Sequence, residues 1–485
     1  MEFIVIFIYV FSLLFIFLFS LGQLHLTLHY IRSKKKTNST LSAFEELPLV
    51  TVQLPVYNEF YVIDRLLDAI GKLTYPKEKL QIQILDDSTD ETSEKAKVLA
   101  DRMKSNGMNI ELIHRPDRVG FKAGALQYGL DISTGDYIAI FDADFLPEPD
   151  FLMKTIPHFI DPTIGVVQTR WGHINQDYSL LTKLQAFGLN AHFSIEQIGR
   201  SMAGSYINFN GTAGVWRKDC IIDAGGWSSD TLTEDLDLSY RAQLKGWHFK
   251  YLEDVVAPAE LPVLMGAVKS QQFRWNKGAA ETAKKNLGNV FRTNLSWVNK
   301  LHSTFHLLNS SVFIFLLLAA LMSIPMLYIK YQHPPLKILF DIGSVFLIGF
   351  FSITFFYWTS VKYSSIRQKK TYFLKTYPLF LSISMGLSLH NSLAVLEGIT
   401  GFRSDFIRTP KFNIRNRGES WANNKYIKPK INWTTIMEGL LCLYFLFGLY
   451  LGYSIKDYGL MIFHIMLAFG FASVFYYSVK PLRIG

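Results

Sequence analysis

Two aspartates separated by one residue follow a short apolar stretch. Asp142 and Asp144 flank Ala143 in DYIAIFDAD. Carboxylates at this spacing can reach one cation together with substrate oxygens, and Mg²⁺ and Mn²⁺ prefer such hard oxygen ligands. The alternative is an ordinary polar strand end, so the pair alone leaves both interpretations open.

Polar clusters also follow two earlier predicted strands. Tyr57 and Glu59 come after TVQLP, and Asp86 and Asp87 come after LQIQIL. In parallel α/β sheets, ligands bind beyond the carboxyl ends of the strands, which makes these side chains candidate ligand contacts. The alternative for the two aspartates is capping of the next helix, for which Ser88, Thr89 and Asp90 are better candidates.

A lysine lies at the start of a predicted helix in VGFKAGAL. Lys122 follows Gly120 by two residues. A lysine beside free helix N–H groups suits a diphosphate, because both carry positive charge. The alternative is a solvated surface lysine.

The stretch TLTEDLDLSYRAQLKGW contains a second acidic pair. Glu234 and Asp235 follow Thr233, and in the first turn of a helix their charges would favour the helix dipole. That interpretation explains their acidity. It explains less well why they combine with the glycine-rich NFNGTAGVWRK before them and QQFRW after them.

QQFRW, at 271–275, combines amide, guanidinium and indole side chains ahead of strongly apolar sequence. On its own it fits an amphipathic helix on a membrane surface, with Phe273 and Trp275 in the interface and Arg274 at the headgroups.

The elements that must position these residues alternate between strands and helices. Strands are predicted at TVQLP, LQIQIL, NIELIH and DYIAIF, and helices over 59–71, 91–103 and 123–130. This alternation predicts an α/β domain around a largely parallel, Rossmann-like sheet.

Membrane-grade apolar sequence flanks this domain. The 485 residues are 49% hydrophobic and 15% aromatic. Residues 3–22 are uncharged, and the basic residues that follow are typical of a cytoplasmic loop rather than of a cleaved signal peptide: Arg32, Lys34, Lys35 and Lys36. Four further windows are long enough to span a bilayer, at about 306–328, 338–361, 434–455 and 458–478.

One apolar stretch is interrupted by serines, His390 and Asn391. We interpret 373–397 as an interfacial helix, because a crossing there would place the basic segment 401–430 outside. This gives five spans, with six as the alternative. The expected domains are an N-terminal helix (1–31), a cytoplasmic domain with interfacial helices (32–300) and a transmembrane region (301–485).

The formal net charge of +9 does not by itself indicate nucleic-acid binding, because basic loops beside membrane helices follow from topology. Cys220 and Cys442 suggest neither a disulfide framework nor a metal cluster.

Taken in order, these motifs resemble the D, DxD, TED, QxxRW series of processive family-2 glycosyltransferases, which include cellulose, mannan, hyaluronan and chitin synthases. The stretch from FNGTAGVWRK to QQFRWNKG is especially similar to the cellulose synthase-like mannan and glucan synthases. The resemblance covers roughly 49–415 and implies a GT-A-type domain inserted between transmembrane helices. It also extends to FIRTPK, which is similar to the FxVTxK gating loop but departs from it at Arg408; its matching residues are Phe406, Thr409 and Lys411.

The resemblance also implies roles. Asp86 or Asp87 would contact the nucleotide, with Tyr57 and Glu59 at the same edge. Asp144, with Asp142, would hold Mg²⁺ or Mn²⁺ on the diphosphate. The remaining expected roles are charge neutralisation by Lys122 and Arg274, general base chemistry by Asp235 beside Glu234, and acceptor binding by Gln271 and Trp275.

The expected activity is inverting transfer of a sugar from a nucleotide-sugar donor, of the GDP-mannose or UDP-glucose class, to a growing β-linked polysaccharide. Export of that polysaccharide by the same protein is also expected. The expected location is the plasma (inner) membrane, with lipid contacts and no nucleic-acid partner. A lipid glycosyltransferase of the ceramide glucosyltransferase type, adding one sugar, is the alternative. A transporter or scaffold with an inactive domain is the third possibility.

Overall fold

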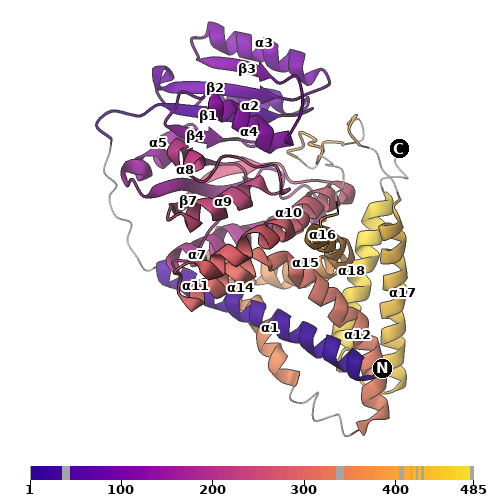
Figure 1. The fold of residues 1–485 in the computed structure, drawn as a ribbon. Coiled ribbons are helices and arrows are strands. Elements are labelled where there is room, and N and C mark those ends of the chain that lie inside the picture. The colour runs from indigo at the N-terminus through magenta and orange to yellow at the C-terminus, as the bar shows by residue number, and fades with distance from the viewer. Residues whose placement is uncertain are drawn as a thin grey trace.

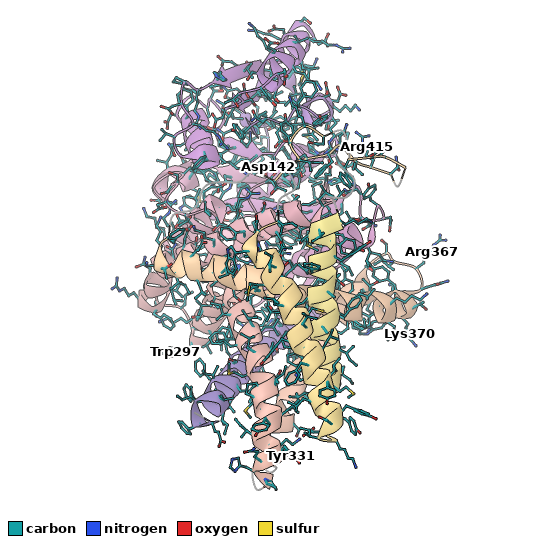
Figure 2. All side chains as sticks on the ribbon, turned by 90° about the vertical axis from the view of Figure 1, so that its right-hand side faces the viewer. Asp142, Trp297, Tyr331, Arg367, Lys370 and Arg415 are labelled. Carbon is teal, nitrogen blue, oxygen red and sulfur yellow. The ribbon has the colours of Figure 1, made fainter. Side chains whose placement is uncertain are left out.

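The computed structural model describes residues 2–34, 44–334, 343–402, 409–416, 418–421, 424–427 and 431–480. Figure 1 shows an α/β layer at the top and long helices below it, with α10 (Met265–Arg292) and α16 (Ser388–Thr400) where the two layers meet. In the perpendicular view of Figure 2, Asp142 lies in the upper layer and Tyr331 at the far end of the helices.

A seven-stranded sheet organises the upper layer in the order β3-β2-β1-β4-β6-β5-β7. Its strands are β1 (Val50–Val56), β2 (Leu80–Asp86), β3 (Ile110–His114), β4 (Tyr137–Ile140), β5 (Ile164–His173), β6 (Gly214–Arg217) and β7 (His248–Ala259). The first four strands run parallel, whereas β6 is antiparallel to β4 and β5. The predicted Rossmann-like sheet is thus confirmed, with one reversed strand.

The parallel strands have few exposed positions because helices cover both faces of the sheet. All of β1 is buried except one partly exposed residue, and β4 is buried throughout. Strands buried on both faces read as near-continuous apolar runs, which is why TVQLP and DYIAIF were recognisable. The helices of this layer are α2 (Ile63–Ile70), α3 (Thr92–Ser105), α4 (Phe121–Asp131), α5 (Phe151–Thr155), α6 (Leu180–Ala191), α7 (Gln197–Met202), α8 (Lys218–Asp223) and α9 (Glu234–Leu244).

One predicted helix begins later than expected. The 59–71 pattern becomes α2 only at Ile63, because the chain after β1 first makes an irregular turn in which Asn58 has a φ of 54°. The backbone N–H of Asn58 donates to the Ser88 hydroxyl at 2.8 Å, and the side-chain oxygen of Asn58 accepts from the backbone N–H of Thr89 at 2.9 Å. These two hydrogen bonds hold the turn. Tyr57 and Glu59 are therefore presented on a loop rather than on a helix.

Five helices are long and apolar enough to cross a membrane: Glu2–Ser33 (α1), Asn309–Gln332 (containing α12, Val312–Gln332), Ser344–Tyr363 (containing α14, Leu347–Tyr363), Trp433–Ser454 (α17) and Met461–Val479 (α18). These are the five predicted windows. The stretch predicted as one interfacial helix is instead two, α15 (Lys369–Gly386) and α16, bent by 49°. By length and composition the described chain offers five spans, or six if that pair counts as one.

Close backbone contacts pack the long helices together. A Cβ on Gly386 of α15 would lie 2.3 Å from the carbonyl oxygen of Gly470 in α18. A Cβ on Gly398 of α16 would lie 2.5 Å from the carbonyl oxygen of Lys277 in α10. Only glycine allows the helices to approach this closely, so α10 is fixed firmly against the membrane-side helices.

Candidate active site

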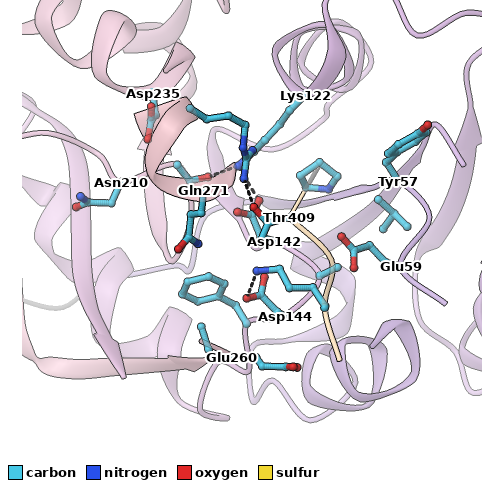
Figure 3. Close-up of a pocket in the computed structure, with 18 of the residues that line it drawn as sticks. Tyr57, Glu59, Lys122, Asp142, Asp144, Asn210, Asp235, Glu260, Gln271 and Thr409 are labelled. Atoms are coloured by element: carbon cyan, nitrogen blue, oxygen red, sulfur yellow. Dashed lines mark hydrogen bonds and ion pairs between the residues drawn. The ribbon is translucent and has the colours of Figure 1, made fainter. Parts of the chain in front are cut away.

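A cavity of about 220 Å³ opens at the carboxyl ends of β1, β2 and β4. Its walls also include the start of α9, one face of α10 and the segment around 409–411. Figure 3 shows Asp235 and Asn210 on one side, Tyr57 and Glu59 on the other, and Lys122, Asp142 and Asp144 between them. The predicted strand-end cluster is therefore one site.

The two aspartates of DAD each contact a lysine. Asp142 Oδ1 lies 2.6 Å from Lys122 Nζ, and Asp144 Oδ2 lies 2.6 Å from Lys411 Nζ. Asp144 is buried, whereas the side chain of Asp142 is 34% exposed. The cavity thus concentrates carboxylate oxygens that already attract cations.

Lys122 is held at the start of α4. Its Nζ donates to the carbonyl oxygen of Gly211 at 2.8 Å and lies 3.9 Å from Glu234. Burial lowers the pKa of Lys122, but the charges of Asp142 and Glu234 outweigh that effect and raise it. Lys122 is therefore a fixed positive charge in the cavity.

Glu234 and Asp235 begin α9 and face the cavity. Burial, and then the negative charge of Glu234, raise the pKa of Asp235 to about 7, although Lys122 opposes the shift. Burial likewise raises the pKa of Glu234. A carboxyl that titrates near neutral pH is suited to accept a proton from a substrate hydroxyl.

The QQFRW motif divides between the two faces of α10. Gln271, Arg274 and Trp275 line the cavity. Gln272 points the other way and accepts a hydrogen bond from Asn391 of α16 at 2.9 Å, and the Phe273 ring lies 5.7 Å from that of His390. One motif thus serves both the cavity and the contact with the membrane-side helices.

The strand-end residues do not all reach the cavity. Tyr57, Glu59 and Asp87 line it, but Asp86 does not. Asp86 is fully buried and accepts a hydrogen bond from the backbone N–H of Ser88 at 3.0 Å, bracing the loop after β2. Of the two aspartates considered for nucleotide contact, Asp87 is thus the one at the site.

Thr409 and Lys411, from the described part of the gating-like segment, line the cavity. Thr409 accepts a hydrogen bond from Arg274 at 2.8 Å, and Lys411 meets Asp144. Phe406 lies outside the described residues. Glu260, at the end of β7, anchors the following residues by accepting from the backbone N–H groups of Phe412, Asn413 and Ile414 at 2.9, 3.0 and 3.4 Å.

Several cavity residues were missed from the sequence. Glu260 pairs with Arg65 at 2.6 Å across 195 positions, so no local pattern signals it. Asn210 belongs to the glycine-rich NFNGTAGVWRK, and that stretch was the only signal for it. Trp171 and His173, on β5, also line the cavity.

Comparison with known proteins identifies the group to which the chain is related. Residues 51–220 match the model of glycosyl transferase family 2, and residues 137–361 match that of glycosyl transferase family group 2. The chain therefore contains a family-2 glycosyltransferase domain within residues 51–361.

Similar family-2 glycosyltransferases include two from Arabidopsis thaliana. Glucomannan 4-beta-mannosyltransferase 7 is 43% identical over 251 residues, covering 51% of this chain and 45% of that protein. Glucomannan 4-beta-mannosyltransferase 2 is 44% identical over 250 residues, covering 50% and 47%. The matched part is thus less than half the length of these relatives.

A solved structure supports the fold. The mannosyltransferase PcManGT from Pyrobaculum calidifontis, in complex with GDP-Man and Mn²⁺, superposes with a TM-score of 0.52 at 18% identity, covering 80% of this chain and 100% of that one. At this identity the likeness shows the fold alone. The α/β layer of this family-2 glycosyltransferase has the GT-A-type architecture.

Proposed function

We propose that the protein is an inverting hexosyltransferase that extends a β-linked polysaccharide from a nucleotide-sugar donor at a membrane. The observation that carries this proposal is the convergence of a carboxyl titrating near neutral pH, Asp235, with a cluster of cations around Asp142 and Asp144 in one cavity. The similarity to glucomannan 4-beta-mannosyltransferases supports mannose as the transferred sugar. GDP-mannose is therefore the first donor to test, with UDP-glucose as the second.

A divalent cation fits the donor side of the cavity. Asp144 and Asp142 would hold Mg²⁺ or Mn²⁺, because their oxygens face cationic groups at 2.6 Å and are hard ligands. Among the described residues no group of three His, Cys, Asp or Glu side chains is placed to hold a metal, so diphosphate and water oxygens would complete its coordination. When bound, the cation would neutralise diphosphate charge.

The proposed chemistry is a single displacement. Asp235 takes the proton from the acceptor hydroxyl as that oxygen bonds to the anomeric carbon, and the bond to the nucleoside diphosphate breaks. Lys122 and Arg274 hold the charge that develops on the departing diphosphate. Attack from the face opposite the leaving group converts an α-linked donor into a β-linked product.

The membrane-side helices suit handling of a hydrophilic chain. A polysaccharide cannot cross lipid unaided, and Trp275 offers an aromatic surface to a sugar where the cavity meets α10. Arg32 and Lys34 after the first apolar helix favour a cytoplasmic catalytic domain, and the plasma (inner) membrane is the proposed location. The proposed domain limits remain 1–31, 32–300 and 301–485.

The test uses purified full-length protein in lipid nanodiscs, with radiolabelled GDP-mannose or UDP-glucose and Mg²⁺ or Mn²⁺. We expect a polymer that a β-specific glycosidase degrades and that is not made by Asp235→Asn. A single-sugar lipid product would instead support the lipid glycosyltransferase. An α-linked product would contradict the mechanism, and a wild type without transfer would support a transporter or scaffold.

A further inference from the structure

The helix beside the cavity contains a π-helical turn. Between α6 and α7, residues His192–Glu196 form a π-helix that continues both neighbours. Such turns insert one extra residue into an α-helix and are found frequently at functional sites. Here the turn carries both ends of a hydrogen-bonded pair, because His192 Nδ1 lies 2.6 Å from Glu196 Oε2.

Glu196 is a buried carboxylate with polar partners on two elements. Its other oxygen accepts from Gln23 Nε2 of α1 at 2.7 Å. Burial raises the pKa of Glu196, but the hydrogen bond and charge of His192, the charge of Arg200 and the bond from Gln23 outweigh this and lower it to about 2. Glu196 therefore stays ionised and accepts the Nδ1 proton of His192.

This arrangement fixes the orientation of Asn210. His192 Nε2 lies 3.3 Å from Asn210 Nδ2, and the tautomer that donates Nδ1–H to Glu196 leaves Nε2 free to accept from that amide nitrogen. Asn210 Oδ1 accepts from Gln197 Nε2 at 2.7 Å, which confirms which end of the amide is oxygen.

Asn210 has bonding capacity beyond these two contacts. Among the described partners its amide uses one N–H and one oxygen lone pair, and an amide has two of each. Asn210 lines the cavity, and a Cβ on the adjacent Gly211 would lie 3.0 Å from Asp235 Oδ2. The backbone next to Asn210 is thus beside the proposed base, and Asn210 lies on the same side of the cavity as Asp235, opposite Tyr57 and Glu59 (Figure 3).

We propose that Asn210 binds a hydroxyl group of the acceptor sugar next to Asp235, and that His192 and Glu196 are positioning residues that orient its amide. This inference rests on the proposed function. An amide that both donates and accepts suits a sugar hydroxyl, which also does both. Gln23 extends the hydrogen-bonded chain into α1, so a membrane-side helix helps to hold the acceptor site.

The test compares Asn210→Ala, His192→Phe and Glu196→Gln with Asn208→Ala. Asn208 is a matched control, since it also contacts Gln197 but does not line the cavity. Using GDP-mannose and β-1,4-mannotetraose, we expect Asn210→Ala to raise the KM for the tetrasaccharide about tenfold, the effect of losing a hydrogen bond. In Asn210→Ala, the rate of GDP-mannose hydrolysis without mannotetraose and the affinity for GDP should each stay within twofold of wild type.

His192→Phe and Glu196→Gln should show the same selective loss, because each removes a link that orients the amide while leaving Asn210 in place. An unchanged KM for mannotetraose in Asn210→Ala overturns the inference. Equal losses of hydrolysis, GDP affinity and transfer also overturn it, because they indicate a purely structural role. A wild type that uses neither donor overturns the proposed function as well, whereas elongation by wild type and Asn210→Ala with the same KM for mannotetraose overturns only the role of Asn210.

Discussion

The two sides of the cavity are assembled from different parts of the chain. Lys122, Asp142 and Asp87 come from the α/β layer, within a stretch of sequence that runs from the end of β2 through α3, β3 and α4 to the end of β4. Arg274 and Lys411 come from α10 and from a segment that follows α16. The difference teaches that the sheet layer positions Lys122, Asp142 and Asp87 by itself, whereas the positions of Arg274 and Lys411 depend on the long helices.

Buried ion pairs tie α10 to those helices. Lys269 Nζ lies 2.7 Å from Glu438 of α17, and Lys277 Nζ lies 3.2 Å from Glu397 of α16. Lys269 and Lys277 are eight positions apart on α10, on either side of QQFRW. The side of the cavity that carries Arg274 and Trp275 is therefore connected to the membrane-side helices by ion pairs.

The largest effect should come from Asp235, the carboxyl proposed as the general base. Asp235→Asn should lower kcat by 10²–10⁴-fold, the usual contribution of a general base, with nucleoside diphosphate affinity retained. Because burial and Glu234 raise the pKa of Asp235 to about 7, wild-type activity should rise with pH through neutrality as the basic form accumulates. Initial rates from pH 5.5 to 8.5 measure this, with the cavity-remote Asp219→Asn as control; a flat profile would contradict the assignment.

Breaking the link between α10 and α17 should cost stability. Glu438→Gln leaves Lys269 charged and without its carboxylate, which costs about 3–5 kcal/mol for a buried pair. Thermal unfolding in detergent should show a clear loss, and Lys269→Met combined with Glu438→Gln should recover part of it. The exposed pair Lys245–Asp223 provides the control, because Lys245→Met should change stability by less than about 1 kcal/mol. Equal effects at both pairs would refute the comparison.

A smaller, selective effect is expected on the α10 side. Trp275→Ala should prevent chain extension while nucleotide binding stays close to wild type, because the indole offers a surface to the acceptor rather than to the donor. Product length and calorimetric nucleotide affinity measure the two properties. Trp297→Ala is the matched control, since Trp297 is 72% exposed on α11 (Trp297–Leu307). Loss of nucleotide binding or of folding before loss of extension would show the stacking role to be wrong.

The smallest effect should arise where the two sides meet. Lys411→Met removes the cation beside Asp144, so the affinity of the nucleotide-free protein for Mn²⁺ should rise by a few-fold. Electron paramagnetic resonance titration of free Mn²⁺ detects this change. Lys425→Met, which removes a charge that pairs with Asp90 and Glu91 rather than with Asp144, should leave Mn²⁺ affinity unchanged. A fall in affinity in Lys411→Met would contradict competition at Asp144.

Sequence reasoning found the parts of the site whose chemistry is local. Asp142 and Asp144 follow a readable apolar strand, and QQFRW is a compact pattern. It could not choose between Asp86 and Asp87, because adjacent residues at a strand end point in opposite directions and only the packed sheet decides which one reaches the cavity. Glu260 could not be identified as a cavity residue from a local pattern, because its partners are 152 to 195 positions away in the sequence.

The long helices show the same limit. Their existence followed from uninterrupted apolar runs, but the 49° bend between α15 and α16 did not. The bend arises where α16 turns its polar residues toward α10, as the bond from Asn391 to Gln272 shows. A hydropathy pattern shows that polar residues interrupt an apolar stretch, but it does not show which residues they contact.

The anchoring of residues 409–414 has a consequence for how the protein is made. A ribosome delivers the sheet and α10 first, and Lys411 reaches Asp144 only after α12, α14, α15 and α16 have been synthesised. Because domains fold in order of synthesis, the nascent α/β layer exists for a time with an incomplete cavity. Completion of the cavity therefore follows synthesis of the later helices, so the α/β layer alone does not present the full set of cavity residues.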